Sequence, residues 1–273
     1  MTQPKSLHFL ITGAGRGIGR GLTRLLLAKG HRVFLIDNNK IELEHTVSTH
    51  LQPSFSKDVF HASLTNIRSP SEINSAVKEA AKFFNNRLDV LINNAAFTGS
   101  IGAVSKFEDL SLDDWNTSLE TNLTGPLLLS QACVPLLRAN RAEGREHGGA
   151  IIHMSSTRAR QSEPQSEAYA ATKAGLIGLT HAMASSLAGD GITANAILPG
   201  WINVMNESKD ADEQGTRWED GLSGEEHAWH FSGRVGKVEN VLGAVEFLAR
   251  EKFVNGSEIV LDGGVTRKMV YPE

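Results

Sequence analysis

One stretch near the start of the chain decides the fold: Thr12-Gly13-Ala14-Gly15-Arg16-Gly17-Ile18-Gly19. It follows an apolar run that we interpret as a strand, and it leads into a helical pattern over Gly17–Lys29. Glycines let the backbone turn sharply and approach a pyrophosphate closely. The helix N-terminus then offers free N–H groups and the positive end of its dipole. The stretch therefore predicts a dinucleotide cradle, and a plain tight turn without a ligand is the alternative.

The rest of the chain alternates short apolar runs with longer amphipathic ones. The expected strands are Leu7–Thr12, Arg32–Ile36, Val59–Ala62, Val90–Ile92, Ala150–Met154, Thr193–Leu198 and Glu258–Leu261. The expected helices include Gly17–Lys29, Pro70–Phe84, Trp115–Arg138, Tyr169–Ala188 and Val238–Ala249. Such alternation indicates a parallel sheet covered on both faces. We predict one α/β domain over residues 1–273, a Rossmann-type doubly wound parallel sheet of about seven strands with helices on both faces.

Composition narrows the class of protein. The 273 residues carry a formal net charge of −4, which argues against a nucleic-acid binder with a basic face. No apolar stretch is long enough for a membrane span. The single cysteine, Cys133, cannot form an internal disulfide, which fits a reducing compartment. We expect a cytoplasmic protein with no nucleic-acid or membrane partner.

One charged segment interrupts the rhythm of the chain. Glu207–Glu226 lies between the sixth expected strand and the last expected helix. Long irregular insertions are often lids, so we expect a substrate lid over about residues 201–236. His227 and His230 lie within residues 201–236, but no cysteine or clear third ligand accompanies them. We therefore predict no metal site, and interpret the two histidines as lid packing or substrate contacts.

An acidic residue at the end of the second expected strand bears on the cofactor. Asp37 lies 18 residues beyond Gly19 and can accept hydrogen bonds from ribose hydroxyls. It would also repel a 2′-phosphate, and the two asparagines that follow it offer no positive charge. Arg16 argues the other way, because it lies in the glycine-rich stretch and could reach a phosphate. The pattern favours NAD and leaves NADP open.

A tyrosine and a lysine at helical spacing indicate acid–base chemistry. Tyr169 and Lys173 are four residues apart, so they share one face of the expected helix. A free phenol has a pKa of about 10, and a neighbouring positive charge favours its ionised form. Tyr169 is therefore a candidate general acid and base. Taken alone, the pair would more often be a surface contact.

Polar and turn residues at the expected strand ends supply the context. Ser156 follows the fifth strand, Asn93-Asn94-Ala95 ends the fourth, and Pro199-Gly200 ends the sixth. Ligands of open parallel sheets bind at the carboxyl ends of the strands. Asn122 lies inside an expected helix, where asparagine is mildly unfavourable, so we assign it a buried polar role.

These motifs, in this order, resemble the classical short-chain dehydrogenase/reductase family. The resemblance extends from Leu7 to about Gly264 and rests on Thr12-Gly13, Gly17, Gly19, Asn93-Asn94-Ala95, Asn122, Ser156, Tyr169, Lys173, Pro199-Gly200 and Asp262-Gly263-Gly264. It implies an enzyme that moves a hydride between a nicotinamide cofactor and a secondary alcohol or ketone. It also implies a homo-oligomer, a tetramer or a dimer.

The resemblance further implies a role for each motif. Tyr169 would be the acid and base, and Ser156 would position the reacting oxygen. Lys173 would bind the nicotinamide ribose and lower the pKa of the tyrosine, while Asn122 would help to hold a proton-relay water. The implied cofactor contacts are Gly13, Arg16, Gly17, Ile18, Gly19, Asp37, Ser63, Leu64, Asn94, Ala95, Tyr169, Lys173, Pro199, Gly200 and Ile202.

Some positions depart from the family pattern. Ser63 stands where an aspartate often contacts adenine, so its hydroxyl and the Leu64 backbone would serve instead. Val204 stands where a threonine is common, and that contact could pass to backbone groups or to Asn203. The loop after Ser156 is unusually polar, which suits a small polar or hydroxylated substrate, or a solvated or subunit-facing loop. A non-catalytic nucleotide sensor or scaffold on the same fold is the alternative function.

Overall fold

The computed structural model describes residues 6–99, 106–140 and 144–269. Seven strands form one parallel sheet: β1 (His8–Thr12), β2 (Arg32–Asp37), β3 (Phe60–Leu64), β4 (Val90–Asn93), β5 (Ala150–Met154), β6 (Thr193–Pro199) and β7 (Glu258–Leu261). Their order is β3-β2-β1-β4-β5-β6-β7, and all neighbours pair in parallel. The predicted doubly wound sheet is confirmed. Among the strands, the largest difference in bounds is at β3, which ends two residues later than expected.

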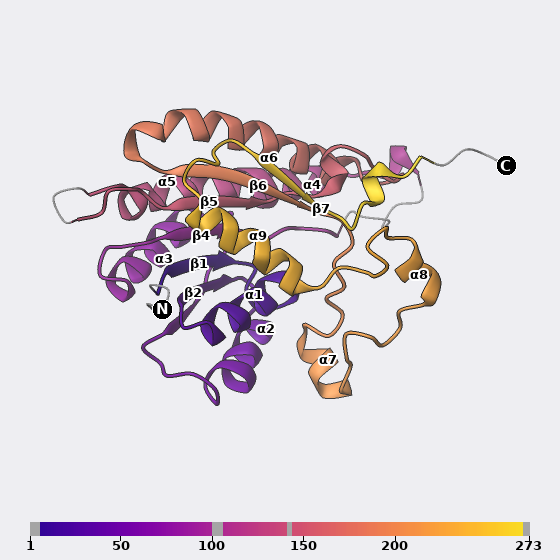
Figure 1. Cartoon of the computed structure of the whole chain (residues 1–273), viewed down its shortest axis with the longest axis horizontal. Helices are drawn as coiled ribbons and strands as arrows, with labels where there is room; N and C mark the ends of the chain where they lie inside the picture. The colour runs from indigo at the N-terminus through magenta and orange to yellow at the C-terminus, as the bar shows by residue number, and fades with distance from the viewer. Residues whose placement is uncertain (1–5, 100–105, 141–143, 270–273) are drawn as a thin grey trace.

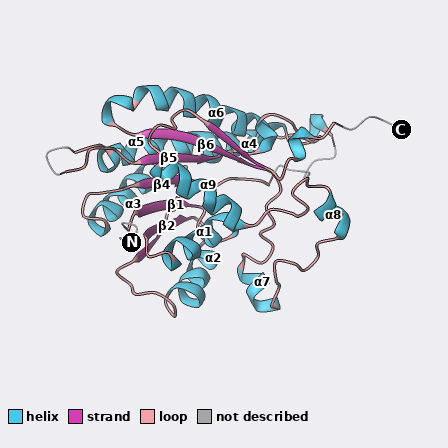
Figure 2. Ribbon diagram, in the orientation of Figure 1, coloured by secondary structure: helices cyan, strands magenta, loops and turns pink. Residues whose placement is uncertain are grey.

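Helices cover both faces of this sheet, as Figures 1 and 2 show. The helices are α1 (Gly17–Ala28), α2 (Lys40–His45), α3 (Pro70–Phe83), α4 (Leu112–Leu119), α5 (Gly125–Leu137), α6 (Glu167–Ser186), α7 (Lys209–Gln214), α8 (Gly224–Ala228) and α9 (Val238–Arg250). α1 and α9 pack against each other on one face, while α3, α5 and α6 cover the other. The chain is therefore a three-layer α/β domain.

The strand side chains alternate between two separate cores. In β1, Phe9 and Ile11 belong to the cluster that includes Leu22 of α1 and Val245 of α9. Leu10, between them, points to the other face and packs in the cluster that includes Leu129 of α5. All of these side chains are buried. A strand buried on both faces reads as a continuous apolar run, which is why the strands were predicted from sequence.

Two π-helical turns interrupt the helices. Thr46–Leu51 continues α2, and Glu120–Thr124 joins α4 to α5. The single helix expected over Trp115–Arg138 therefore begins earlier, at Leu112, and changes its winding in the middle. π turns are rare and frequently mark functional sites.

The expected lid, residues 201–236, which we call the insertion, is more ordered than the sequence suggested. Instead of an irregular segment, it contains α7 and α8, and Figure 1 shows both set away from the sheet. Its two ends meet, because Ile202 and Gly236 form an isolated bridge and Asn203 N donates to the Gly236 carbonyl oxygen at 3.0 Å. Among the described helices, none is long and apolar enough to cross a membrane.

Candidate functional site

A cleft of about 670 Å³ opens at the carboxyl ends of the strands, next to the β1–β4 switch point. It brings together many of the predicted site residues: Gly13, Arg16, Gly17, Ile18, Asp37, Asn94, Ala95, Ser156, Tyr169, Lys173, Pro199 and Gly200. A second hollow of about 620 Å³ lies beside the ends of α1 and α9, and its lining contains none of the predicted site residues. The cleft is the candidate site, because a phenol, an amine, a hydroxyl and a carboxylate converge there.

The glycine-rich loop forms one wall of the cleft and has no room for a side chain at Gly13 or Gly19. A Cβ on Gly19 would lie 2.0 Å from the carbonyl oxygen of Gly13. A Cβ on Gly13, whose φ is +65°, would lie 2.8 Å from the Cα of Ala95. Asn94, directly after β4, holds the start of the loop by donating from Nδ2 to the carbonyl oxygens of Thr12 at 2.9 Å and Gly13 at 3.2 Å. The loop and the ends of β1 and β4 therefore pack closely together, and the first N–H of α1, that of Gly17, donates to the Glu207 carbonyl oxygen at 2.7 Å.

Asp37 is held rigidly at the end of β2. Its Oδ2 accepts from the Gly15 backbone N–H at 2.8 Å, and its Oδ1 accepts from the Asn39 N–H at 2.8 Å. The side chain is 9% exposed, yet it lines the cleft. Arg16 is exposed and lines the same region. An acidic and a basic side chain thus both lie at this end of the cleft.

Lys173 is the most strongly perturbed group in the cleft. It projects from α6 and is 2% exposed, and its Nζ donates to the Met154 carbonyl oxygen at 2.7 Å. Nζ also lies 5.3 Å from the centroid of the Tyr169 ring. Burial lowers the pKa of Lys173 to about 7, because the charged ammonium is removed from water.

Tyr169 experiences opposing influences. Burial raises the pKa of its phenol, while a hydrogen bond with Ser156 and the positive charge of Arg158 lower it. The net direction is upward, which is opposite to the lowering inferred from the spacing of Tyr169 and Lys173. The reason is that desolvation outweighs the nearby charges of the protein. The hydrogen bond nevertheless joins the phenol to the serine at the end of β5.

Asn122 acts through the backbone around it. It lies in the π-helical turn Glu120–Thr124 and is fully buried. Its Oδ1 accepts from the Phe97 N–H at 2.6 Å, and its Nδ2 donates to the Phe97 carbonyl oxygen at 3.0 Å and to Thr172 Oγ1 at 3.2 Å. Asn122 therefore fixes a segment that lines the cleft and connects it to the helix that carries Lys173. It is a positioning residue in this geometry.

Comparisons with known proteins identify the family to which this chain belongs. The family model described as enoyl-(acyl carrier protein) reductase matches residues 13–266. An uncharacterized oxidoreductase of Thermotoga maritima is 31% identical, over 97% of this chain and 97% of its own length. The 3-oxoacyl-(acyl-carrier-protein) reductase FabG of Staphylococcus aureus is 31% identical, over 94% of this chain and 96% of its own. This chain belongs to the short-chain dehydrogenase/reductase family.

The structural comparison leads to the same family. A short chain dehydrogenase from Burkholderia cenocepacia, solved in complex with NADP, has a TM-score of 0.77 and is 26% identical. The alignment covers 97% of this chain and 100% of that one. The resemblance inferred from the motifs is thus confirmed, and the chain is an oxidoreductase of the short-chain dehydrogenase/reductase family.

Several predicted contacts of this dehydrogenase/reductase do not line the cleft. Ser63 Oγ lies 3.0 Å from Glu79 Oε2, and Leu64 is 53% exposed. Ile202 packs at the base of the insertion, against Gly236. Gly19 lies behind the loop, where it allows close packing rather than contact.

Other residues, which the sequence did not indicate, line the cleft. Thr65, Asn66, Ile67 and Arg68 line the cleft after β3, as do Thr117 and Thr121 of α4 and the following π turn. The first four follow directly from the true end of β3 at Leu64, because ligands bind beyond the carboxyl ends of strands. Ser63 was expected as a contact only because the family resemblance implied it.

The histidines of the insertion pack against aromatic rings. The ring of His230 lies 6.2 Å from that of Trp201 and 5.3 Å from that of Trp229, and the ring of His227 lies 5.9 Å from that of Trp218. Among the described residues, neither histidine belongs to a group of three candidate metal ligands. Val204 is the point at which the insertion lines the cleft.

Proposed function

We propose that this short-chain dehydrogenase/reductase transfers a hydride between a nicotinamide cofactor and a secondary alcohol or ketone. One observation carries the proposal: Tyr169, Ser156 and Lys173 line the same cleft as a loop whose Gly13 and Gly19 have no room for a side chain. A sensor or scaffold would need the loop but not the three polar side chains. Hydride transfer uses all of them.

The cleft suits a dinucleotide. The N-terminus of α1 and its glycines would hold the pyrophosphate, and Asp37 would accept from the ribose hydroxyls at the adenosine end. Lys173 would donate to the other ribose, next to Met154 at the end of β5. When bound, the cofactor would supply a hydride for reduction of a ketone and accept one in oxidation of an alcohol. The protein would orient the cofactor and the substrate and would transfer the proton.

The polar side chains divide the remaining work. Ser156 would donate a hydrogen bond to the substrate oxygen and so place it beside the phenol of Tyr169. During oxidation Tyr169 removes the hydroxyl proton, and during reduction it returns the proton to the oxygen. Burial keeps the phenol protonated, and the buried lysine becomes the counter-charge when Tyr169 ionises. Asn122 would hold the neighbouring backbone in position.

We propose NAD as the preferred cofactor, since Asp37 would repel a 2′-phosphate. The Burkholderia relative was solved with NADP, and Arg16 could serve that phosphate here. The ratio of NADH to NADPH affinities tests the choice, because a general loss of binding cancels in a ratio. Asp37→Ala should move the ratio toward NADPH, and Arg16→Gln should move it toward NADH. A ratio unchanged by Asp37→Ala would contradict the proposal.

We propose a small polar or hydroxylated substrate, because the loop after Ser156 carries charge next to Tyr169: the Arg158 guanidinium lies 6.0 Å from the centre of its ring. Arg158 there is paired with Glu163 at 2.5 Å, and Arg160 with Glu258 at 2.6 Å. Since the Staphylococcus relative is a 3-oxoacyl reductase, an acyl thioester belongs in the same substrate panel. We further propose that residues 201–236 form a lid, which bound cofactor would protect from limited proteolysis. A cytoplasmic homo-oligomer remains our prediction, and light scattering tests its subunit number.

The activity itself is tested by the absorbance of nicotinamide at neutral pH. NAD and NADP are offered with polyols, hydroxy acids, cyclic alcohols and a 3-oxoacyl thioester, each with its redox partner. Tyr169→Phe should lower turnover by about 100- to 10,000-fold while leaving cofactor affinity unchanged. Tight cofactor binding without turnover of any substrate by the wild type would favour the sensor.

A further inference from the structure

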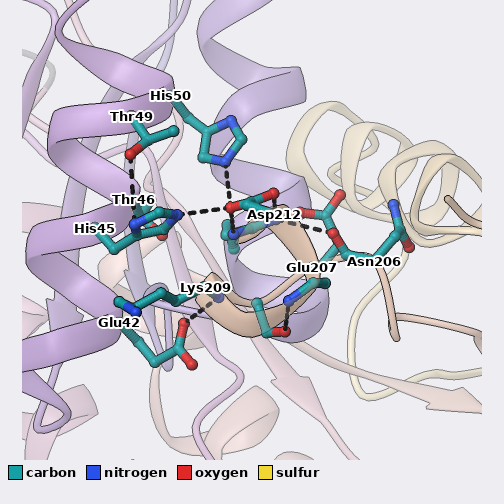
Figure 3. Close-up of polar contacts among 12 residues, drawn as sticks. Glu42, His45, Thr46, Thr49, His50, Asn206, Glu207, Lys209 and Asp212 are labelled. Carbon is teal, nitrogen blue, oxygen red and sulfur yellow. Dashed lines mark hydrogen bonds and ion pairs between the residues drawn. The ribbon is translucent and has the colours of Figure 1, made fainter. Parts of the chain in front are cut away.

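A cluster of polar side chains joins the insertion to the outside of the fold, beside α1 and α2 (Figure 3). The Nε2 atoms of His45 and His50 each lie 2.8 Å from one carboxylate oxygen, Oδ2 of Asp212. The three side chains are partly buried, with 16%, 20% and 21% of their surfaces exposed. Their three donor atoms all lie within 4.8 Å of one another. This convergence lies outside the cofactor cleft and has no role in the proposed hydride transfer.

The local fold explains why two histidines five residues apart point the same way. α2 ends at His45 and continues as the π-helical turn Thr46–Leu51. A π turn pairs residue i with residue i+5, so side chains at this spacing lie one above the other. An α-helix, at 3.6 residues per turn, would place them on different faces. Asp212 comes from α7 in the insertion, 162 residues beyond His50.

Two imidazole nitrogens and one carboxylate oxygen are a ligand set for divalent transition metals, Zn²⁺ in particular. Zn²⁺ binds such atoms at about 2.0 to 2.2 Å, so its ligand atoms lie roughly 3.3 Å apart. Each imidazole would therefore move outward by about 0.5 Å, which partly exposed side chains allow. We propose that His45, His50 and Asp212 bind a divalent transition-metal ion, with solvent as the fourth ligand. The site departs from the expectation of no metal drawn from the sequence.

The surroundings prepare Asp212 as a ligand. Arg20 and the two histidines lie within hydrogen-bond distance of its carboxylate, so both of its oxygens are held in place. Arg20 donates to both oxygens of Asp212, from Nη1 to Oδ2 at 2.7 Å and from Nη2 to Oδ1 at 3.1 Å. An ion bound at Oδ2 would displace the first of these contacts, whereas the second can remain. Arg20 is itself paired with Glu207 at 2.8 Å, which offsets its positive charge. His45 Nδ1 lies 3.4 Å from Thr49 Oγ1, an outer partner that can orient the ring.

An ion at this position would clamp the insertion against the nucleotide-binding half of the fold. α7 already contacts α2 through the Lys209 N–H, which donates to Glu42 Oε2 at 2.9 Å. The Glu207 carbonyl oxygen accepts from the Gly17 N–H at 2.7 Å, at the first residue of α1. The clamp would therefore restrain the insertion next to the glycine-rich loop. Its effect would be on stability and on the mobility of the insertion.

The test is calorimetric titration of the full-length, tag-free, chelator-treated protein with ZnCl₂, without cofactor or substrate. We expect one Zn²⁺ per chain, with the affinity lowered at least tenfold in His45→Gln and in His50→Gln. His147→Gln, at an exposed position outside the cluster, is the matched control and should bind as the wild type does. Co²⁺ titration gives a second readout, because its visible absorption reports the ligand geometry. Zn²⁺ should also raise the melting temperature of the wild type but not of the two histidine variants.

Two results would overturn the proposal. One is the absence of saturable Zn²⁺ binding to the wild type at micromolar concentrations. The other is wild-type affinity in both His45→Gln and His50→Gln, which would place bound zinc elsewhere. Far-ultraviolet circular dichroism establishes that the variants are folded, and the partly exposed side chains make this the expected outcome. Because no step depends on turnover, failure of this proposal is distinct from failure of the proposed activity.

Discussion

Removing the buried charge of Lys173 should stabilise the protein while abolishing its activity. A pKa of about 7 in place of 10.5 corresponds to about 5 kcal/mol by which burial penalises the ammonium below pH 7. Lys173→Met removes this penalty and also the hydrogen bond to the Met154 carbonyl, whose loss costs about 1 to 3 kcal/mol. We expect the free energy of unfolding of the variant to exceed that of the wild type by about 2 to 4 kcal/mol at pH 6.

The sign of the pH dependence provides the stricter test. The unfolded lysine stays protonated up to about pH 10.5, whereas the folded one loses its proton near pH 7. Between these values the unfolded state binds more protons, so the stability of the wild type rises with pH. From pH 7 to 9 the rise from this group amounts to about 2 kcal/mol. The advantage of Lys173→Met should therefore shrink toward zero at pH 9.

The assay is urea unfolding at pH 6, 7.5 and 9, followed by tryptophan fluorescence at one protein concentration, since assembly would otherwise shift the midpoint. Lys78→Met, at an exposed position of α3, is the matched control and should leave the pH dependence unchanged. Parallel pH profiles for the wild type and Lys173→Met would refute the reasoning, as would a variant less stable than the wild type at pH 6.

Three further substitutions probe the loop, the insertion and the π turn. Gly19→Ala places a Cβ 2.0 Å from a backbone oxygen, so the cradle must open, and NADH affinity measured by fluorescence should fall at least tenfold. Arg20→Met leaves Glu207 with Arg24 alone and Asp212 without its guanidinium partner, and chemical unfolding should show a loss of about 3 to 5 kcal/mol. Asn122→Ala releases the backbone beside the cleft and should lower kcat by about 100-fold, while cofactor affinity stays near that of the wild type.

Matched controls exist for each of these. Gly178→Ala lies on α6 with no heavy atom within 4 Å of the added Cβ and should bind NADH normally. Arg217→Met removes an exposed arginine of the insertion and should change stability by less than about 0.5 kcal/mol. Asn116→Ala, at an exposed position of α4, should leave kcat unchanged. If a control behaved like its partner variant, the structural reason given for that partner would be wrong.

The central strands were predictable from sequence because they are buried on both faces. β5, whose five residues are all buried, has the predicted bounds, and so does the half-buried edge strand β7. β3 was placed less well, since Phe60 is its one buried residue and the run has no clear end. Ser63, which the family resemblance implied as a cofactor contact, has its hydroxyl against Glu79 instead of lining the cleft.

Contacts between segments remote in the chain could not be predicted. Asp212 contacts His45 and His50 only because the insertion folds back on α2, and no local sequence pattern predicts this contact. The π turn that aligns the two histidines also has no sequence signature, because its residues suit an ordinary helix. By contrast, Tyr169 and Lys173 share one helix face, so their proximity followed from spacing, and the polar residues at the strand ends indicated that the pair faces the cleft.

The meeting of the two ends of the insertion has a consequence for the evolution of specificity. Gly236 N donates to the Trp201 carbonyl oxygen at 3.0 Å, so the segment leaves and rejoins the domain at one point. The entropy of closing a loop grows only slowly with length, and a doubling costs about 0.6 kcal/mol. The segment can therefore lengthen, shorten or be exchanged between relatives while the sheet beneath it stays intact. With the lid role proposed above, new substrates would be recruited by transplanting this one segment onto an unchanged cleft.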